Sequence, residues 1–174
     1  MSSSARSGAR RAATQSTIAT IGVYGATLER FLDALATAGI AIVLDVRQRR
    51  GVRGPEYSWA NAQRLQRALA DAGLGYHHLR GLAPTTELRH LQYAIDEAAG
   101  VGKRSRTRLA PEYVEGYLRE ILDRADLGEL LGALPATGIG ALMCVERDPE
   151  ACHRSLIAER LATEHGFSVL DLRP

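Results

Sequence analysis

The stretch that decides the fold class is IAIVLDVR, residues 40–47. It is apolar through Leu44, and a nearly continuous apolar run of this length is typical of a strand buried on both faces of a parallel sheet. The segment before it has apolar residues at helical spacing over residues 28–35 and stops at Gly39. An amphipathic helix that leads into a buried strand indicates the α/β class, because parallel strands need crossover connections that are usually helical.

The rest of the chain repeats this alternation of apolar runs and amphipathic segments. We expect strands at residues 17–24, 40–47, 75–80, 138–144 and 167–172. We expect helices at residues 27–39, 58–73, 86–98, 111–121, 127–134 and 149–164. The prediction is a single three-layer, Rossmann-like α/β domain over residues 17–174, in which a mostly parallel sheet of about five strands has helices on both faces.

Length and composition agree with one globular domain. The chain has 174 residues, of which 45% are hydrophobic and 24% charged. This composition excludes a disordered chain, a collagen-like fibre and a disulfide mini-protein. Every apolar run is far shorter than the ~20 residues that span a bilayer, so no membrane partner is expected. The net charge of +2 is too small to predict a partner by itself.

Cysteine usage and the N-terminus predict the compartment. The two cysteines, Cys144 and Cys152, are too few for a secreted disulfide scaffold. Residues 1–16 are rich in Ser, Ala and Arg and lack the apolar stretch of a secretory signal. We therefore expect a cytoplasmic protein whose residues 1–16 form a disordered basic tail.

Polar and reactive residues stand where the predicted strands end. Tyr24 ends the first strand, Asp45 and Arg47 end the second, and Cys144 and Glu146 follow the fourth. In open parallel sheets, ligands bind beyond the carboxyl ends of the strands. The sequence therefore predicts a pocket at this edge of the sheet.

The strongest local motif is MCVERDPEACHRS, residues 143–155. We expect Cys152, His153 and Arg154 to lie in the first turns of a helix, where free N–H groups and the helix dipole favour anions. A thiol there, beside His153 and Arg154, has a lowered pKa and a larger thiolate fraction. A reactive cysteine or an anion pocket is one interpretation, and a pair of buried structural cysteines is the other.

The spacing of the residues tests two more specific interpretations of this motif, a phosphatase loop and a zinc site. A phosphatase loop needs the pattern C-x5-R, but counting from Cys144 and Cys152 reaches Glu150 and Ala158. A zinc site could use both cysteines and His153, but consecutive helical residues point about 100° apart. The spacing of the two cysteines also lies outside the usual short zinc pairs. We expect no metal and no cofactor.

Asp45 and Arg47 lie on the same side of their strand, because side chains alternate along it. They predict either a structural ion pair or a functional Asp45 that acts as a general base or binds a sugar hydroxyl. The loop that follows mixes arginines, glycines and aromatic residues and contains Arg53 and Ser58. Arginine binds phosphate bidentately and aromatic rings stack on bases, whereas the alternative is a solvated loop in which Trp59 anchors the next helix.

Several of these segments together resemble the bacterial domain of unknown function 488 family. The resemblance is carried by GVYG (22–25), LERF (28–31), LDVR (44–47), YHHL (76–79), LMCVE (142–146) and CHRSLIA (152–158). It covers roughly residues 18–172. The chain departs from the family after the first strand, where Val23, Tyr24 and Gly25 stand in place of a common His-Ser pair. The resemblance implies the fold and the position of the site.

The leading hypothesis is an enzyme-like domain that binds a small anionic ligand, either phosphate-bearing or nucleotide-like. The candidate binding residues are Tyr24, Arg47, Arg53, Ser58 and Arg154. The candidate catalytic residues are Cys144 or Cys152 as the nucleophile, Asp45 or Glu146 for proton transfer, and His153 as the orienting or protonating group.

Two alternative functions stay open. One is a non-catalytic nucleic-acid-binding module, in which the basic tail, the loop at residues 47–53 and the connector at residues 103–108 follow a phosphate backbone. That hypothesis requires the loop and the connector to share one face of the domain. The other alternative is a thiol redox pair or metal site at Cys144 and Cys152.

Overall fold

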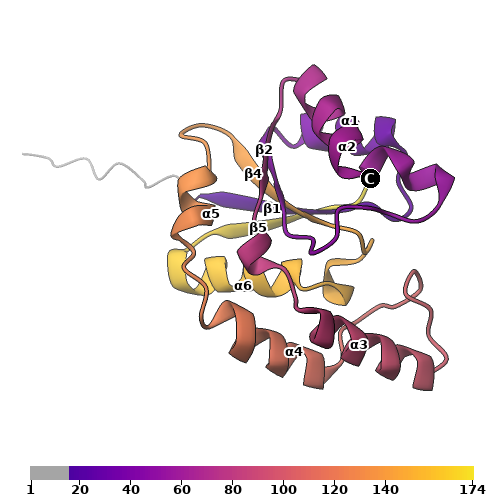
Figure 1. Ribbon diagram of the computed structural model, residues 1–174. Helices are drawn as coiled ribbons and strands as arrows, with labels where there is room; N and C mark the ends of the chain where they lie inside the picture. Colours follow the sequence, from indigo (N-terminus) through magenta and orange to yellow (C-terminus); the bar gives the residue numbers. More distant parts are fainter. Residues whose placement is uncertain (1–15) are drawn as a thin grey trace, which may run out of the picture.

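Residues 16–174 are described by the computed structural model, and their five strands form one parallel sheet (Figure 1). The strand order is β3-β2-β4-β1-β5. The strands are β1 (Thr17–Gly22), β2 (Ile40–Asp45), β3 (Gly75–His78), β4 (Ile139–Cys144) and β5 (Ser168–Leu172). The predicted tail, residues 1–16, lies outside the described residues apart from Ser16.

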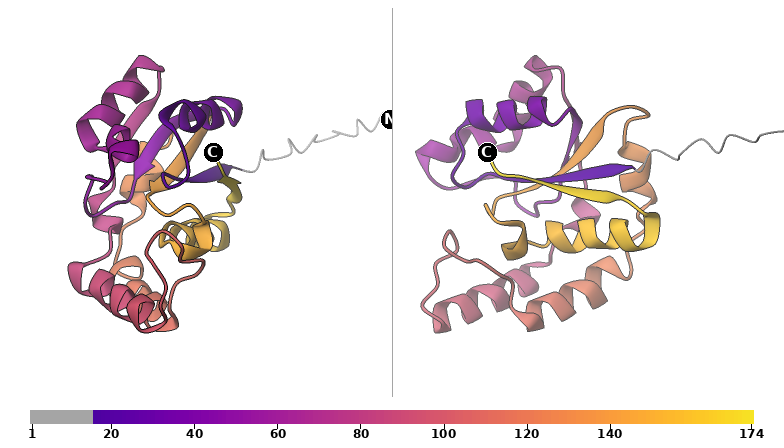
Figure 2. Two further views of the ribbon diagram at one scale, coloured as in Figure 1. Left: turned by 90° about the vertical axis from the view of Figure 1, so that its right-hand side faces the viewer. Right: turned by 180° about the vertical axis from the view of Figure 1, so that it is seen from behind.

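Helices cover both faces of this sheet. On one face lie α1 (Leu28–Thr37) and α2 (Ala62–Asp71), as Figures 1 and 2 show. On the other face lie α3 (Thr86–Ala98), α4 (Pro111–Tyr117), α5 (Gly128–Ala133) and α6 (Arg154–His165), and α4 continues into a π-helical turn, Leu118–Leu122. The predicted three-layer α/β class is confirmed. Within residues 16–174, no helix is long and apolar enough to cross a bilayer.

The central strands are buried on both faces, which explains their continuous apolar runs. Along β4, Leu142 packs into the core on the α6 side, whereas Met143 packs into the core on the α1 side. Ile18 and Ala19 divide in the same way along β1. Because successive side chains of a strand point to opposite faces, apolar residues are favoured at consecutive positions of such a strand.

The helix predicted from Ser58 begins later than expected. Pro55–Ala60 is a 3-10 turn, and Asn61 is extended (φ −67°, ψ 142°) before α2 begins at Ala62. The prediction that Ser58 opens a helix is therefore wrong. By contrast, α3 has the predicted bounds, Thr86–Ala98, because the Thr85 hydroxyl caps it by accepting a hydrogen bond from the third residue of the helix.

The segment that carries Cys152 also differs from the prediction. Pro149–Ala151 is a 3-10 turn closed by a hydrogen bond from the Cys152 amide to the Pro149 carbonyl. Cys152 itself is extended (φ −142°, ψ 142°), and α6 begins only at Arg154. The prediction that Cys152 lies in the first turns of the helix is wrong, and the thiol belongs to the strand-to-helix loop.

The end of β1 touches the loop that follows β4. The amides of Val23 and Tyr24 both donate to the carbonyl of Val145, at 3.2 and 2.9 Å. Gly22 lies so close to this loop that a Cβ on it would overlap the backbone carbonyl oxygen of Glu146. A glycine at this position allows the two strand ends to approach each other.

We expect the substitution Gly22→Ala to lower the free energy of unfolding by roughly 1–3 kcal/mol, because the added methyl group meets backbone rather than a movable side chain. The matched control is Gly132→Ala in α5, where an added Cβ has nothing within 4 Å. That variant should be neutral or up to ~1 kcal/mol more stable. Urea unfolding of both variants measures the difference, and equal stabilities would contradict the close approach.

Candidate functional site

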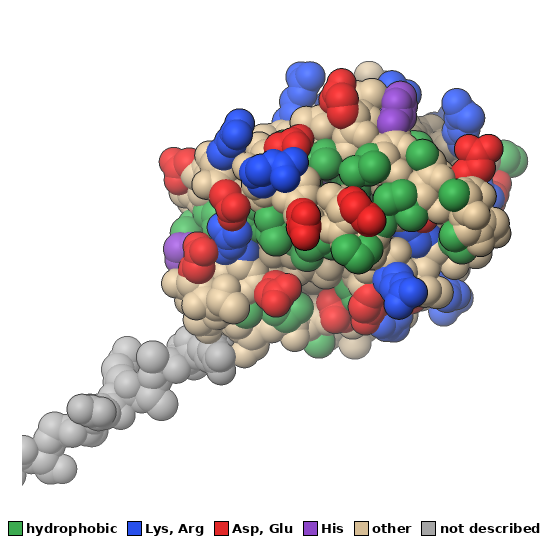
Figure 3. Space-filling model, turned by 90° about the horizontal axis from the view of Figure 1, so that it is seen from below, with side chains coloured by type: hydrophobic (Ala, Val, Ile, Leu, Met, Phe, Trp, Pro, Cys, Tyr) green, Lys and Arg blue, Asp and Glu red, His purple; other side chains and the backbone are tan. Residues whose placement is uncertain are grey.

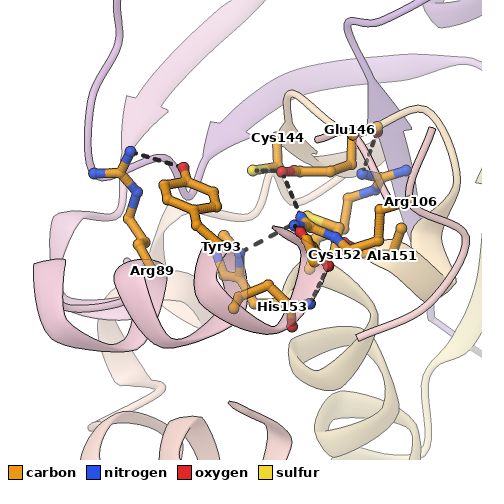
Figure 4. A network of polar contacts seen from close by, with 12 residues as sticks. Arg89, Tyr93, Arg106, Cys144, Glu146, Ala151, Cys152 and His153 are labelled. Atoms are coloured by element: carbon orange, nitrogen blue, oxygen red, sulfur yellow. Dashed lines mark hydrogen bonds and ion pairs between the residues drawn. The ribbon is translucent and has the colours of Figure 1, made fainter. Parts of the chain in front are cut away.

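A cavity of about 700 Å³ lies at the carboxyl ends of β2 and β4. Cys144, Glu146, Cys152 and His153 line it from the β4–α6 segment, and Figure 4 shows how they converge. The opposite wall comes from α3 and from the connector at residues 101–109. The cavity therefore lies where a ligand is expected in an open parallel sheet.

The Cys152 thiol and the His153 ring form the reactive centre of this cavity. Cys152 Sγ lies 3.7 Å from His153 Nδ1. The other ring nitrogen, Nε2, lies 2.9 Å from the carbonyl oxygen of Val46. A carbonyl only accepts hydrogen bonds, so Nε2 carries a hydrogen and Nδ1 is left to interact with the thiol.

Cys144 lies beside this pair. Its thiol donates a hydrogen bond to Glu146 Oε2 at 3.4 Å. The sulfurs of both cysteines and a ring nitrogen of His153 all lie within 4.8 Å of one another. The single S–H hydrogen of Cys144 thus lies between a carboxylate and a second sulfur.

The two thiols have opposite pKa shifts. Burial opposes the ionisation of Cys152, but the hydrogen bond from Cys144 and the positive charges of His153 and Arg154 outweigh it, so the pKa of Cys152 falls well below the ordinary thiol value. The same hydrogen bond, together with burial, raises the pKa of Cys144. Burial lowers the pKa of His153, yet the adjacent Cys152 thiolate raises it overall. These directions favour negative charge on Cys152 rather than on Cys144.

Glu146 is held in place by Arg106. The guanidinium donates to Glu146 Oε1 at 3.0 Å, to Asp96 Oδ2 at 2.7 Å and to the carbonyl of Ala151. Burial raises the pKa of Glu146, and the charge of Arg106 reduces that rise. The sequence places Arg106 only in a basic connector, and nothing in its spacing predicts that this side chain turns inward to the site.

Asp45 and Arg47 form a fixed ion pair. Arg47 Nε and NH2 donate to the two Asp45 oxygens at 2.9 and 2.8 Å, and the Tyr76 hydroxyl donates to Asp45 Oδ2 at 2.6 Å. Burial raises the pKa of Tyr76 to about 12, so its hydroxyl remains a donor. Arg47 also donates to the carbonyl of Ala60 and lines the cavity. Of the two predicted alternatives, a structural ion pair and a functional Asp45, this geometry is that of the structural ion pair.

The remaining predicted binding residues separate into two groups. Tyr24 and Arg53 line the cavity, as Arg47 does. Ser58 lies in the 3-10 turn before α2, away from the cavity lining. Arg154 is fully buried and donates to the carbonyls of Glu146 and Arg147, at 2.7 and 2.9 Å. Its guanidinium supports the loop beneath the cavity.

The rim of the cavity joins the arginine loop to the connector. The guanidinium of Arg104 lies 5.3 Å from the ring centroid of Tyr24 and 5.2 Å from that of Tyr57. It also donates to the carbonyl of Arg53 at 3.0 Å and pairs with Glu56. The two basic segments named in the nucleic-acid hypothesis therefore lie side by side.

Sequence reasoning missed the wall formed by α3 and the start of α4. Tyr93 and Tyr113 line the cavity. The ring of Tyr93 lies 5.6 Å from the Arg89 guanidinium and 5.5 Å from Lys103 Nζ. The sequence shows only amphipathic helices here, and their spacing predicts packing rather than a pocket wall. No signal in the sequence alone marks these residues.

The backbone at Cys152 removes one of the two reasons for which the sequence predicts no metal site. Divergence of consecutive helical residues does not apply to Cys152 and His153, because Cys152 is extended and precedes the helix. Cys144, Cys152 and His153 could hold a soft metal ion through their sulfurs and ring nitrogen. Arg106 and Arg154 add positive charge around the group, which opposes the binding of a cation.

Fold and site together define a class: a parallel three-layer α/β domain with a Cys-His pair at the strand ends. The chain belongs to the family described as Domain of unknown function DUF488, whose model matches residues 27–161. This match confirms the resemblance seen in the sequence motifs. No curated protein and no solved structure matches the chain.

Two of the predicted phosphate-binding arginines should differ in stability tests. Arg154→Ala leaves the buried Glu146 carbonyl and the partly buried Arg147 carbonyl without this donor, so we expect a loss of about 3 kcal/mol in unfolding free energy. Arg53→Ala removes an exposed side chain and should change stability by less than ~0.5 kcal/mol. Guanidinium unfolding measures both. A stable Arg154→Ala variant would show that its guanidinium does not support the loop.

Proposed function

We propose that this domain is enzyme-like, that it binds a small anionic ligand, phosphate-bearing or nucleotide-like, and that Cys152 is its nucleophile. The observation that carries the proposal is the placement of Cys152 Sγ beside His153 Nδ1, with Nε2 fixed on the Val46 carbonyl, inside the cavity. A nucleophile, a base and a group that orients the base are the parts of an activated cysteine site.

Charge supports an anionic ligand. In the part of the chain that the structure describes, the cavity lining contains seven Arg and Lys residues and three Asp and Glu residues. Arg47 and Arg106 are engaged by carboxylates. Arg49 and Arg53 are exposed at the rim and form no ion pair among residues 16–174. These two arginines are available to a phosphate group, and Tyr24 beside them offers a ring to a base.

The proposed chemistry is attack by the Cys152 thiolate on an electrophilic centre of the ligand. A bond forms from Sγ to that centre, the bond to the leaving group breaks, and His153 Nδ1 protonates the leaving group. The positive charge of His153, 3.7 Å away, favours the thiolate before attack. Two free thiols persist in a reducing compartment, which supports a cytoplasmic location as part of this proposal.

We expect Cys152 to react faster than Cys144 with alkylating reagents and to favour anionic iodoacetate over neutral iodoacetamide. Because the pKa of Cys152 is lowered, its rate should persist as the pH falls below the range near 8.5 in which an ordinary thiol becomes protonated. Rates against pH on Cys144→Ser and Cys152→Ser measure this. Faster alkylation of Cys144 would contradict the assignment of the nucleophile.

Two arginine variants test whether the cavity rim attracts the anionic reagent, and the second of them is the matched control. Arg53→Ala should lower the ratio of the iodoacetate rate to the iodoacetamide rate several-fold, because it removes a positive charge from the cavity rim. Arg67→Ala removes the same charge from the exposed face of α2 and should leave the ratio unchanged. Inorganic phosphate should slow the wild-type reaction. If Arg53→Ala leaves the ratio unchanged and phosphate does not slow the wild-type reaction, the proposal that the ligand is anionic is contradicted.

The contact between Arg104 and the Arg53 carbonyl favours a second candidate, the nucleic-acid-binding module. It brings the loop and the connector together, as that hypothesis requires. On the face seen from below in Figure 3, acidic and apolar side chains are interspersed with basic ones, so that face offers no continuous basic track. The rim, where the loop and the connector meet, is therefore the candidate surface for a phosphate backbone.

We expect any nucleic-acid binding at this rim to be weak and to fall steeply with salt, because only a few arginines could displace counterions. Single-stranded and duplex DNA and RNA, titrated at low and at physiological salt, measure it. Arg104→Ala should weaken binding by separating the two segments. If no nucleic acid binds at low salt, the nucleic-acid-binding function is excluded and the small-ligand proposal is left.

A further inference from the structure

We propose that Cys152 and Cys144 form a peroxide-reactive dithiol, in which Cys152 is oxidised by a hydroperoxide and Cys144 then closes a disulfide with it. This inference goes beyond the proposed function and rests on the same Cys152 thiolate. The two activities use different reagents, and each is measured without the other.

The geometry brings the two sulfurs together from separate elements. Cys144 is the last residue of β4, and Cys152 lies in the loop that precedes α6. Both sulfurs lie within 4.8 Å of each other, both residues line the same cavity, and both thiols are free. Because Cys152 lies outside the helix, its side chain can approach Cys144 without unwinding α6. Redox-reactive cysteines have this arrangement of an ionised thiol poised beside a resolving thiol.

The surroundings assign a different role to each cysteine. His153 Nδ1, 3.7 Å from Cys152 Sγ, favours the thiolate that attacks a peroxide oxygen. Cys144 instead faces Glu146 Oε2 at 3.4 Å, so it keeps its proton until a carboxylate takes it. Arg106 holds that carboxylate in position through Glu146 Oε1. Cys152 is the attacking thiol, Cys144 the resolving thiol, and Glu146 a positioning and proton-accepting group.

Both steps balance with the hydroperoxide as the oxidant. The Cys152 thiolate attacks one peroxide oxygen, the O–O bond breaks, and the departing alkoxide or hydroxide takes a proton from His153. The product is a sulfenic acid on Cys152. Cys144 then attacks this sulfur, its proton goes to Glu146, the S–O bond breaks, and the hydroxyl leaves as water after protonation. The net change is two thiols and one hydroperoxide to one disulfide, one alcohol or water, and one water.

The experiment treats the full, reduced protein with hydrogen peroxide in thiol-free buffer and follows its intact mass. The wild type should lose the mass of two hydrogen atoms. Cys144→Ser should instead gain one oxygen and react with dimedone, a reagent for sulfenic acids. Cys152→Ser should be oxidised at least ~10-fold more slowly, because the remaining thiol is protonated. Glu146→Gln should still form the sulfenic acid but close the disulfide more slowly, because the group that accepts the Cys144 proton is lost.

Several results would overturn the proposal. A wild type that gains oxygen without closing the disulfide would show that Cys144 does not resolve the sulfenic acid. Oxidation of Cys152→Ser at the wild-type rate would reverse the roles. A metal ion retained in the native mass of wild type, and lost from Cys144→Ser, would replace the dithiol with a metal site. Preference for iodoacetate and protection by phosphate report on the anionic ligand alone, so a failure of the ligand proposal is distinguishable from a failure of the dithiol proposal.

Discussion

The hydrogen bond between His153 Nε2 and the Val46 carbonyl is the contact on which the site depends. It is 2.9 Å long and joins residues 107 positions apart in the chain, one just beyond β2 and one just before α6. Because the carbonyl is buried and only accepts, rotating the ring or moving its hydrogen to Nδ1 would leave it unpaired. The sheet that brings β2 next to β4 thereby fixes which ring nitrogen faces Cys152.

The buried charged groups around this contact position the residues of the site more than they stabilise the fold. Arg106 satisfies two carboxylates and a carbonyl, and Arg154 satisfies two carbonyls of the β4–α6 loop. A buried ion pair often contributes no more stability than apolar residues of the same volume. The apolar cores on the two faces of the sheet stabilise the fold. The polar network determines the positions of Cys144, Glu146 and Cys152.

The parts of the molecule that follow from local physics were predictable from the sequence. Apolar runs and helical spacing predicted the parallel sheet and the bounds of α3, and the polar residues at the strand ends predicted a pocket there. The extended backbone of Cys152 was not predictable, because the 3-10 turn that precedes it competes closely with a helix that starts at Pro149. The inward turn of Arg106 was not predictable either, since its carboxylate partners lie 10 and 40 positions away. Composition marks an arginine as basic but does not show which carboxylates the fold places beside it.

The burial of Cys152 links the two proposed activities. Its side chain is only 1% exposed, so reagents reach it through the cavity rather than from bulk water. The hydrogen bond from Cys144 stabilises the thiolate for attack on a ligand, and the same neighbouring thiol is the nearest sulfur to a sulfenic acid on Cys152. A bound anion would fill the space that a peroxide must cross. If both proposals hold, a ligand in the cavity would protect the thiol from oxidation, whereas an empty cavity would leave both reactions open to it.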